Sequence, residues 1–266
     1  MSADLALSAR GVHMEYRDRT ADSTLVAIET MDLDVGEGEF VSLLGPSGCG
    51  KSTFLKIVNG LLKATAGEIT LRSAGKGRED AMVFQDSALF PWYSVVDNVA
   101  YGLVCAGVSR REARARALPF IDLVGLQGFA GKYPYQLSGG MQQRANLARA
   151  LAVDSAILLM DEPFAALDAQ TREVMQAELL RIWNAAKKTV VFVTHQIDEA
   201  VYLSDRVIVM AARPGRIIAD IRIDLPRPRQ LDVKRTPEFG LYENEIWRLI
   251  ASQQQARVAT PQPVGA

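Results

Sequence analysis

The sequence has few cysteines and lacks long apolar runs. Two cysteines, Cys49 and Cys105, are too few for a disulfide framework and suit a reducing compartment. Apolar runs stay well short of the roughly 18–20 residues that span a bilayer. Residues 1–10 lack the basic stretch and apolar segment of a secretory signal. We therefore expect a cytoplasmic globular protein.

The chain also lacks an excess of charge of either sign. Thirty Lys and Arg residues against 31 Asp and Glu residues give a net charge of −1. This balance argues against nucleic-acid binding driven by overall charge, although it leaves room for a local basic patch. With 48% hydrophobic residues in 266, the chain has enough apolar material for one large domain or two small ones.

Short apolar segments alternate with helical patterns, which predicts an α/β fold. Strands are predicted over 5–13, 40–44, 68–72, 81–84, 157–160, 189–193, 206–210 and 217–225. Helices are predicted over 51–59, 95–106, 110–124, 139–151, 171–186, 196–203 and 238–252. Segments that are apolar on both faces, such as 190–193, are typical of buried parallel strands. Residues 85–152 read as successive helices, and we interpret them as a mostly helical insertion.

A glycine-rich segment between a predicted strand and a predicted helix matches the pattern G-x-x-x-x-G-K-[ST] of phosphate-binding loops. This phosphate loop consists of Gly45, Pro46, Ser47, Gly48, Cys49, Gly50, Lys51 and Ser52. Glycines let backbone N–H groups turn toward phosphate oxygens, and the helix start adds unpaired donors. Lys51 can lie between the β- and γ-phosphates, Ser52 can bind Mg²⁺, and Thr53 can reach the α-phosphate. The alternative, a glycine-rich turn with an incidental lysine, does not explain the flanking strand and helix.

Two carboxylates, Asp161 and Glu162, follow the apolar strand predicted at 157–160. A phosphate loop needs a carboxylate on a neighbouring strand for the Mg²⁺ shell, and Asp161 is the candidate. Glu162 can accept a proton from an attacking water. Two solvated acids that cap a helix at Pro163 are the alternative, which the phosphate loop disfavours.

Residues 137–144, Leu-Ser-Gly-Gly-Met-Gln-Gln-Arg, resemble the signature motif of ATP-binding cassette (ABC) ATPases. The resemblance implies that Ser138, Gly139 and Gly140 contact the γ-phosphate of ATP held by the opposite subunit. Met141 stands where the family usually has Gln. Because the phosphate-facing atoms belong to the serine and the glycines, we expect function to survive. A simple helix N-cap at Ser138 is the alternative.

Four further positions match the family in order along the chain. Gln85 resembles the Q-loop glutamine that senses Mg²⁺ and the attacking water, and Asp168 resembles the D-loop residue at the dimer interface. His195 resembles the switch histidine that contacts the γ-phosphate, and Tyr16 resembles the aromatic residue that stacks on adenine. A surface amide, a helix cap and ordinary packing are the alternatives for Gln85, His195 and Tyr16. The polar residues 17–23 could shift the adenine contact.

The resemblance implies the architecture of a P-loop NTPase of the ABC type. Its parts are a mostly parallel sheet core, an antiparallel β-subdomain and a helical subdomain at about 86–152. We expect the ATPase domain to span 1–235, and 236–266 to form a C-terminal helix and flexible tail. The implied cofactors are ATP and Mg²⁺, with two ATP molecules bound in a head-to-tail dimer of identical or paralogous chains.

Several segments are similar to the ATPases of nitrate, sulfonate and taurine importers. They are 37–41, 84–85, 89–92, 97–99, 213–218 and 225–229. In that group, residues 90–93 line a groove for a cytoplasmic helix of the membrane permease; core packing is the alternative. We interpret the basic residues Arg227, Arg229, Lys234 and Arg235 as a solvated charge run, with acidic lipid headgroups or partner loops as the alternative.

The implied protein is peripheral on the cytoplasmic face of the cell membrane and drives a permease served by an extracytoplasmic solute-binding protein. Nitrate, alkanesulfonate, taurine and pyrimidine-type vitamin precursors all remain open as solutes. One alternative function is an ATPase of an exporter or lipid-transport system. Others are a soluble ATPase acting on DNA or ribosomes, and a regulatory module that does not hydrolyse ATP. We expect no nucleic-acid partner.

Overall fold

A computed structural model describes residues 4–18, 23–72, 80–85, 88–153, 155–186, 188–212 and 214–259. The chain divides into two compact units. The helical unit contains residues 1–7, 35–39 and 71–192, and the sheet unit contains residues 8–34, 40–70 and 193–266.

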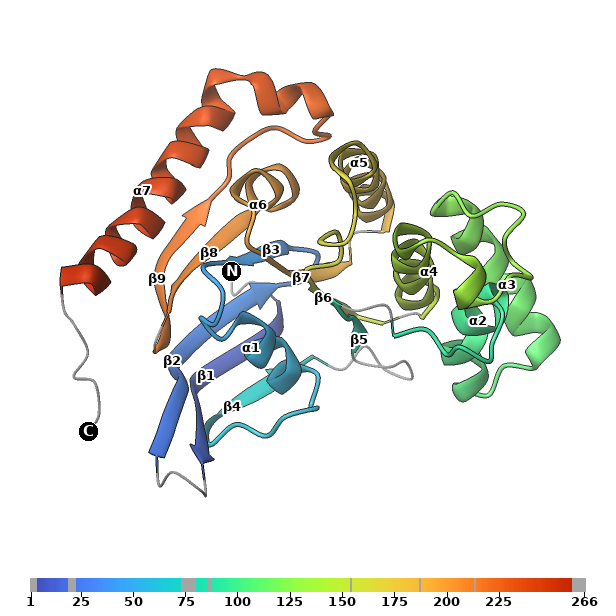
Figure 1. Ribbon diagram of the computed structural model, residues 1–266, viewed down its shortest axis with the longest axis horizontal. Helices are drawn as coiled ribbons and strands as arrows, with labels where there is room; N and C mark the ends of the chain where they lie inside the picture. Colours follow the sequence, from blue (N-terminus) through green and yellow to red (C-terminus); the bar gives the residue numbers. More distant parts are fainter. Residues whose placement is uncertain are drawn as a thin grey trace. The chain divides into compact units, whose positions relative to one another are not determined.

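The elements follow the order shown in Figure 1. The strands are β1 (Leu5–Asp18), β2 (Ser23–Gly36), β3 (Phe40–Leu44), β4 (Ala66–Leu71), β5 (Asp80–Val83), β6 (Ile157–Asp161), β7 (Thr189–Thr194), β8 (Arg206–Ala211) and β9 (Gly215–Arg222). The helices are α1 (Lys51–Val58), α2 (Val95–Cys105), α3 (Arg110–Leu123), α4 (Gly139–Ala152), α5 (Ala169–Ala186), α6 (Ile197–Leu203) and α7 (Pro237–Ala259), with 3₁₀ turns at Pro134–Gln136 and Leu231–Arg235. Within the described ranges, every helix is too short or too polar to cross a bilayer.

The strands of the sheet unit lie in the order β4-β1-β2-β9-β8-β3. Strand β3 runs parallel to β8, with Val41 opposite Arg206, and β8 runs antiparallel to β9. All five residues of β3 are buried, as expected for a central strand of apolar residues. Helix α7 packs against α6 and β8. The unit therefore combines parallel and antiparallel pairing, in agreement with the expected α/β class.

Strand β2 was not predicted, although its second half alternates regularly. Met31, Leu33 and Val35 are buried, whereas Asp32 and Asp34 on the other face are not. Aspartate has low intrinsic strand propensity. In the fold, Asp32 accepts the Gly11 N–H at 2.7 Å, and Asp34 pairs with Arg10 at 2.7 Å. These cross-strand partners make an acidic outer face compatible with a strand.

In the helical unit, β6 lies between β7 and β5, and it runs parallel to β5. Helices α2, α3 and α4 pack on one another, which confirms the predicted succession of helices between β5 and β6 (Figure 1). Their N-caps are Ser94, Ser109 and Ser138, and each hydroxyl accepts a backbone N–H of the first turn. Serine at each start satisfies one otherwise unpaired helix donor.

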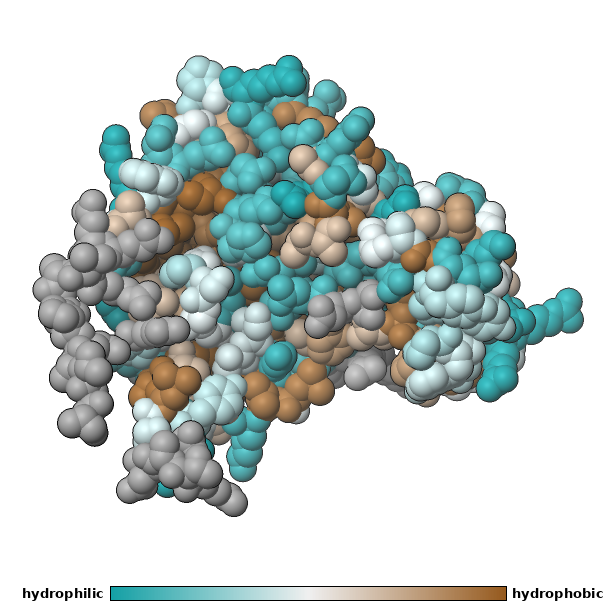
Figure 2. Space-filling model, viewed as in Figure 1, coloured by the Kyte–Doolittle hydropathy of each residue, from teal (hydrophilic) through white to brown (hydrophobic). Residues whose placement is uncertain are grey.

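Apolar residues are concentrated in the interior of the two units. On the face in Figure 2, hydrophilic side chains predominate and the hydrophobic ones form small separate groups. The fully buried set includes residues of β3, β6, β7 and β8. Buried parallel strands thus account for the apolar segments recognised in the sequence.

The segment after β9 corrects one prediction. Arg229 is buried, and its guanidinium donates to the carbonyls of Val201, Tyr202, Ser204, Ile223 and Leu225 at 2.7–3.4 Å. Arg227 pairs with Asp205 at 2.8 Å, and Lys234 pairs with Asp198 at 3.0 Å. The solvated charge run was therefore wrong for these three residues, although Arg235 is exposed. For the two arginines, the reason is that the last carbonyls of α6 have no helical partners and accept the arginine donors. For Lys234, the reason is the ion pair with Asp198.

The C-terminal helix begins as predicted and extends further. Helix α7 runs from Pro237 to Ala259 rather than ending at residue 252. Strand β9 covers Gly215–Arg222, so the strand predicted at 217–225 begins earlier and ends sooner. Residues 260–266 of the predicted tail lie outside the described residues.

Candidate nucleotide site

The phosphate loop lies in the sheet unit between the buried strand β3 and helix α1. Gly48 and Gly50 have φ angles of +76° and +88°, a region that favours glycine. Gly50 is the N-cap of α1, which begins at Lys51 as predicted. The loop thus has the strand–loop–helix context that places backbone donors and a helix N-terminus around an anion.

Lys51 is buried inside the loop. Its Nζ donates to the Gly45 carbonyl at 2.7 Å and to the Pro46 carbonyl at 3.1 Å, and lies 3.6 Å from Cys49 Sγ. The groups that contact this buried side chain are two neutral carbonyls and a thiol. This donor set fits a polyphosphate, which would provide charge-assisted acceptors in place of the carbonyls.

Cys49 is also buried, and burial raises the pKa of its thiol, against the opposing effect of Lys51. A raised pKa keeps the thiol protonated and poorly nucleophilic. Its backbone N–H donates to the Pro46 carbonyl at 3.3 Å. Cys49 thus acts as a small side chain inside the loop.

Three backbone segments of the sheet unit lie directly against the phosphate loop. A Cβ on Gly45 would lie 2.5 Å from the Met210 carbonyl oxygen, and a Cβ on Gly50 would lie 2.9 Å from the Ala27 carbonyl oxygen. A Cβ on Gly215 would lie 2.4 Å from the Cys49 carbonyl oxygen. Sequence reasoning did not find these supports; the turn glycine at position 215 was the signal for one of them.

His195 follows β7 in the sheet unit and is exposed. The residues around it are held by hydrogen bonds within the unit. Thr194 Oγ1 donates to Glu199 Oε2 at 2.5 Å and accepts the Gln196 N–H at 3.0 Å. Glu199 lies in α6, whose C-terminal carbonyls Arg229 binds. The His195 loop is therefore anchored through α6 to the C-terminal segment.

Tyr16 lies on β1 in the sheet unit and is 41% exposed. Its neighbours Arg17 and Glu15 form an ion pair at 3.1 Å. Of the polar residues 17–23 that could shift the adenine contact, 19–22 lie outside the described residues. An exposed ring on a strand offers an apolar face for stacking on a base.

The two predicted acids lie in the helical unit at the end of β6. Asp161 is buried, and Glu162 is partly buried. Among the described residues, Glu162 alone combines a side chain with a positive φ, at +46°. Such a conformation costs about 1–3 kcal/mol and persists where the surrounding structure imposes it, commonly at functional sites. The backbone conformation therefore makes Glu162 a candidate functional residue.

Gln85 is exposed just after β5 in the helical unit. The preceding carbonyl, that of Phe84, accepts hydrogen bonds from Gln143 Nε2 and Asn146 Nδ2, both at 3.3 Å. Both donors belong to α4, the helix that begins at the signature motif. The position of Gln85 is thus linked to that helix by two side chains.

The signature residues begin α4. The Ser138 hydroxyl accepts the Met141 N–H at 3.3 Å, so the N-cap foreseen as an alternative is present. Ser138 and Gly139 are exposed, which leaves them open to a second partner. A Cβ on Gly140 would lie 3.1 Å from Leu167 Cδ2, so this glycine allows the signature turn to approach the residues before Asp168.

Asp168 is exposed and caps α5 by accepting the Thr171 N–H at 3.0 Å. Hydrogen bonding with Thr171 lowers the pKa of the Asp168 carboxyl. Arg172 donates to the carbonyl oxygens of Leu167 at 2.8 Å and Phe164 at 3.4 Å. These bonds hold the segment between Glu162 and α5 in a defined turn.

The predicted site residues all lie within the described ranges, and they divide between the two units. The sheet unit holds Tyr16, the phosphate loop with Thr53, and His195. The helical unit holds Gln85, Ser138, Gly139, Gly140, Asp161, Glu162 and Asp168. The sequence did not predict three supporting contacts. Ala27 and Gly215 lie against the phosphate loop, and Arg229 binds the carbonyls at the end of α6.

Comparisons with known proteins agree on one family. The family model described as ABC transporter matches residues 28–165. The chain is 51% identical over 230 residues to the ABC transporter ATP-binding protein MJ0412 of Methanocaldococcus jannaschii, covering 85% of each chain. It is 47% identical over 246 residues to the taurine import ATP-binding protein TauB of Rhizobium johnstonii, covering 89% of this chain and 93% of that protein.

A solved structure is also similar. It is the dimeric post-hydrolysis state of the ATP-binding cassette MJ0796 bound to ADP and phosphate, at 33% identity and a TM-score of 0.74. The similarity covers 83% of this chain and 100% of that one. The α/β fold expected for a P-loop NTPase of this kind is therefore confirmed. The chain belongs to the ABC transporter family, as an ATP-hydrolysing subunit of the group that contains the taurine import ATP-binding proteins.

Proposed function

We propose that this protein is the energy-coupling ATPase of an importer for taurine, a sulfonate, nitrate or a related small solute. The observation that carries the proposal is the phosphate loop around the buried Lys51, in a chain 43–47% identical to taurine import ATP-binding proteins. An ATPase of an exporter or lipid-transport system is the second candidate, because it would hydrolyse ATP with the same kind of domain.

The loop amides and Lys51 would hold the β- and γ-phosphates of ATP, with Thr53 at the α-phosphate and Tyr16 against the adenine. Glu162 would accept the proton of the attacking water, and His195 would support the charge that develops on the γ-phosphate. Catalysis in this arrangement rests on positioning and charge stabilisation. The anchored loop around His195 and the imposed turn at Glu162 support such fixed roles.

Mg²⁺ would be held by the Ser52 hydroxyl, the Gln85 amide oxygen and the Asp161 carboxylate. Hydroxyl, amide and carboxylate oxygens are the hard ligands that Mg²⁺ prefers. When bound, the ion neutralises charge on the β- and γ-phosphate oxygens. Asp161 is buried at the end of β6, next to Glu162.

We propose that two chains close head to tail on two ATP molecules, each signature motif facing the loop of the other chain. Exposure of Ser138 and Gly139 supports this, as does the dimeric state of the related cassette. Closure would be driven by ATP and released by hydrolysis. The Met141 backbone N–H donates to the Ser138 hydroxyl. Because this contact uses only the backbone, Met in place of the usual Gln would leave Ser138 and the two glycines in the same arrangement.

The proposed partners are transmembrane permease subunits, and through them an extracytoplasmic solute-binding protein. The protein would lie peripherally on the cytoplasmic face of the cell membrane. The proposed ATPase domain spans 1–235 with its helical subdomain at about 86–152, followed by the C-terminal helix and tail at 236–266. Trp92, 67% exposed, supports the proposal that the segment at residues 90–93 faces the permease.

Affinity purification of the tagged chain from native membranes, with partners identified by mass spectrometry, tests the proposal. Recovery of a polytopic permease encoded beside a solute-binding protein is the expected result. A permease without such a gene neighbour would favour the exporter candidate. Recovery as a soluble protein, or with ribosomes or DNA, would overturn the transport function and leave the ATPase activity standing.

A further inference from the structure

His195 lies between two residues that are joined by one buried hydroxyl group. Thr194, the last residue of β7, precedes it, and Gln196, the N-cap of α6, follows it. Thr194 is buried, and its Oγ1 accepts the Gln196 N–H at 3.0 Å. This bond closes a turn around the backbone of the exposed His195. The direction in which the histidine side chain leaves the backbone therefore depends on the Thr194 hydroxyl.

The Thr194 hydroxyl is in turn held by a buried acid. Thr194 Oγ1 donates its single proton to Glu199 Oε2 at 2.5 Å, and both side chains are buried. With the proton directed at the carboxylate, the lone pairs of Oγ1 remain for the Gln196 N–H. Without an acceptor at position 199, the hydroxyl could rotate and donate elsewhere. Glu199 thus determines which way the hydroxyl points.

Glu199 lies on a helix that is fixed at both ends. At the C-terminal end of α6, Arg229 Nη1 donates to three backbone carbonyls at 2.7–3.0 Å. At the N-terminal end, Lys234 Nζ pairs with Asp198 Oδ2 at 3.0 Å, one residue before Glu199. The carboxylate that holds Thr194 is therefore carried by a firmly held element.

We propose that Thr194 and Glu199 are positioning residues for His195, because their hydrogen bond holds the turn from which the imidazole reaches the γ-phosphate of bound ATP. The inference rests on the proposed function and adds two residues to it. A buried hydroxyl and a buried carboxylate cost free energy that apolar side chains would not. Since Val and Leu would fill similar space at these two positions, packing alone does not account for the pair.

The proposed role predicts a separation of hydrolysis from binding. A displacement of about 1 Å near a reacting centre can cost roughly a hundredfold in rate. The turn around His195 is separate in sequence from the phosphate loop, which holds the buried Lys51. Loss of the Thr194–Glu199 hydrogen bond should therefore lower the rate of hydrolysis and leave ATP affinity nearly unchanged.

Steady-state ATP hydrolysis by the full-length chain tests the proposal. Thr194→Val keeps the shape of the side chain and removes the hydroxyl, so kcat should fall by about tenfold or more while KM changes by less than about twofold. Thr194→Ser keeps the hydroxyl and should retain most of the rate. Glu199→Leu should behave like Thr194→Val, and Glu199→Gln, which keeps an acceptor oxygen, should behave like Thr194→Ser.

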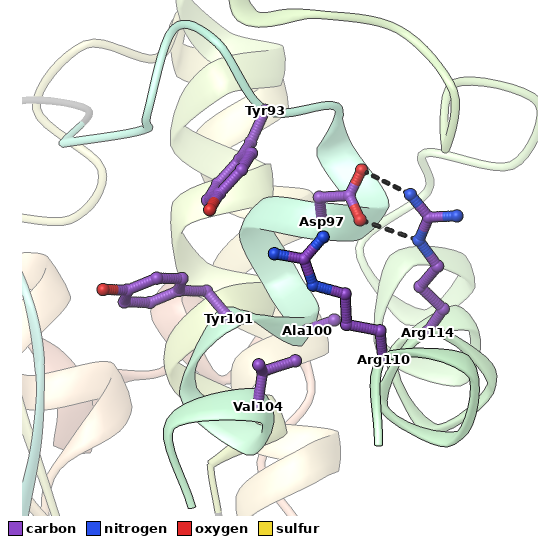
Figure 3. A pocket seen from close by; sticks show the side chains of 7 residues that line it. All are labelled: Tyr93, Asp97, Ala100, Tyr101, Val104, Arg110 and Arg114. Carbon is purple, nitrogen blue, oxygen red and sulfur yellow. Dashed lines mark hydrogen bonds and ion pairs between the residues drawn. The ribbon is translucent and has the colours of Figure 1, made fainter. Parts of the chain in front are cut away.

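Two control variants separate the proposed role from a loss of stability. The Thr189 hydroxyl, at the other end of β7, is buried and accepts the Gly38 N–H at 3.0 Å, so Thr189→Val also removes a buried hydroxyl from a backbone amide. In the pocket between α2 and α3, Arg114→Gln breaks the bidentate pair with Asp97 that the dashed lines in Figure 3 mark. Both controls should unfold at lower urea concentration and keep the wild-type kcat.

A double-mutant cycle tests whether Thr194 acts through His195. In a His195→Ala background, Thr194→Val should have no further effect on the single-turnover rate, because the side chain that it positions is absent. A further fall of about tenfold would overturn the proposal, as would an unchanged kcat in Thr194→Val or equal losses in Thr194→Val and Thr194→Ser. Normal hydrolysis by His195→Ala alone would instead contradict the role of His195 in the proposed function.

Discussion

Gly215 begins β9 so close to Cys49 that a Cβ at position 215 would lie 2.4 Å from the Cys49 carbonyl oxygen. The same Cβ would lie 2.6 Å from the Ala27 carbonyl oxygen. Both neighbours are backbone atoms, which cannot rotate away as a side chain could. The phosphate loop thus keeps its form partly because position 215, in a distant part of the sequence, has no side chain.

Gly215→Ala should displace the loop. We expect ATP affinity to fall by about tenfold or more, and stability to fall by about 1–3 kcal/mol from overpacking. Isothermal titration with a non-hydrolysable ATP analogue and urea unfolding measure the two effects. Gly240→Ala, with nothing within 4 Å of its Cβ on α7 of the same unit, is the control. It should leave ATP affinity unchanged and should not lower stability, because Ala favours a helix over Gly by up to about 1 kcal/mol. Equal affinities for wild type and Gly215→Ala would mean that the loop tolerates the shift.

Lys51→Ala should abolish measurable ATP binding, because the buried ammonium in the loop would be lost. The same titration with an ATP analogue measures this, with circular dichroism to verify folding. Lys63→Ala removes an exposed lysine of the same unit and should bind like the wild type. An unchanged affinity in Lys51→Ala would contradict the assignment of the phosphate loop.

Glu162→Gln should lower ATP hydrolysis by about a hundredfold or more and leave ATP binding intact, since the base is lost but the shape is retained. Gln carries the same backbone penalty as Glu at φ +46°, so the turn should persist. We expect the variant to accumulate as an ATP-bound dimer in size-exclusion chromatography. Glu173→Gln, at an exposed position of α5, is the control. A monomeric variant with normal turnover would exclude Glu162 as the base.

Arg229→Met should destabilise the protein by about 2–4 kcal/mol, because it leaves the carbonyls at the end of α6 without donors. Burial, with the nearby charge of Arg227, lowers the pKa of Arg229 to about 10, so the residue is charged at neutral pH. Urea unfolding measures the change in stability. Arg222→Met removes a guanidinium whose side chain is 82% exposed and should shift the stability by less than about 0.5 kcal/mol. Similar losses of stability in Arg229→Met and Arg222→Met would contradict the anchoring role of Arg229.

Asp97 should contribute to stability in a pH-dependent way. Hydrogen bonding to Arg114, and then to Ser94, lowers the pKa of the Asp97 carboxyl. A lowered folded-state pKa means that the contribution is present above the unfolded value of about 3.9 and is lost as the pH falls through the folded value. The unfolding free energy of wild type should therefore exceed that of Asp97→Asn by about 1 kcal/mol at pH 7, and the difference should shrink below about pH 4.

Urea unfolding across this pH range measures the difference, with Asp122→Asn at an exposed position of α3 as the control. Arg114→Gln should reproduce most of the loss at pH 7, since it removes the same pair. A difference between wild type and Asp97→Asn that is constant with pH would contradict the ionic origin.

The sequence alone determined the fold class, most of the elements and the candidate site. Residues 45–52 lie together in a short stretch between a strand and a helix, so their pattern is local. Apolar strands such as β6 and β7 are buried on both faces, and their composition is therefore distinctive without knowledge of their neighbours. The N-cap at Ser138 was likewise foreseen from the local sequence, whereas the N-caps at Ser94 and Ser109 were not predicted.

Only the tertiary structure decided the features that depend on distant partners. The aspartates of strand β2 are paired with the Gly11 N–H and the Arg10 guanidinium of β1. Arg229 is buried because the carbonyls at the end of α6 accept its hydrogen bonds. The positive φ of Glu162 and the close approach of Gly215 to Cys49 are properties of the assembled backbone. Sequence patterns record which residues prefer burial, but a charged residue is buried only where the fold brings its hydrogen-bond partners to it.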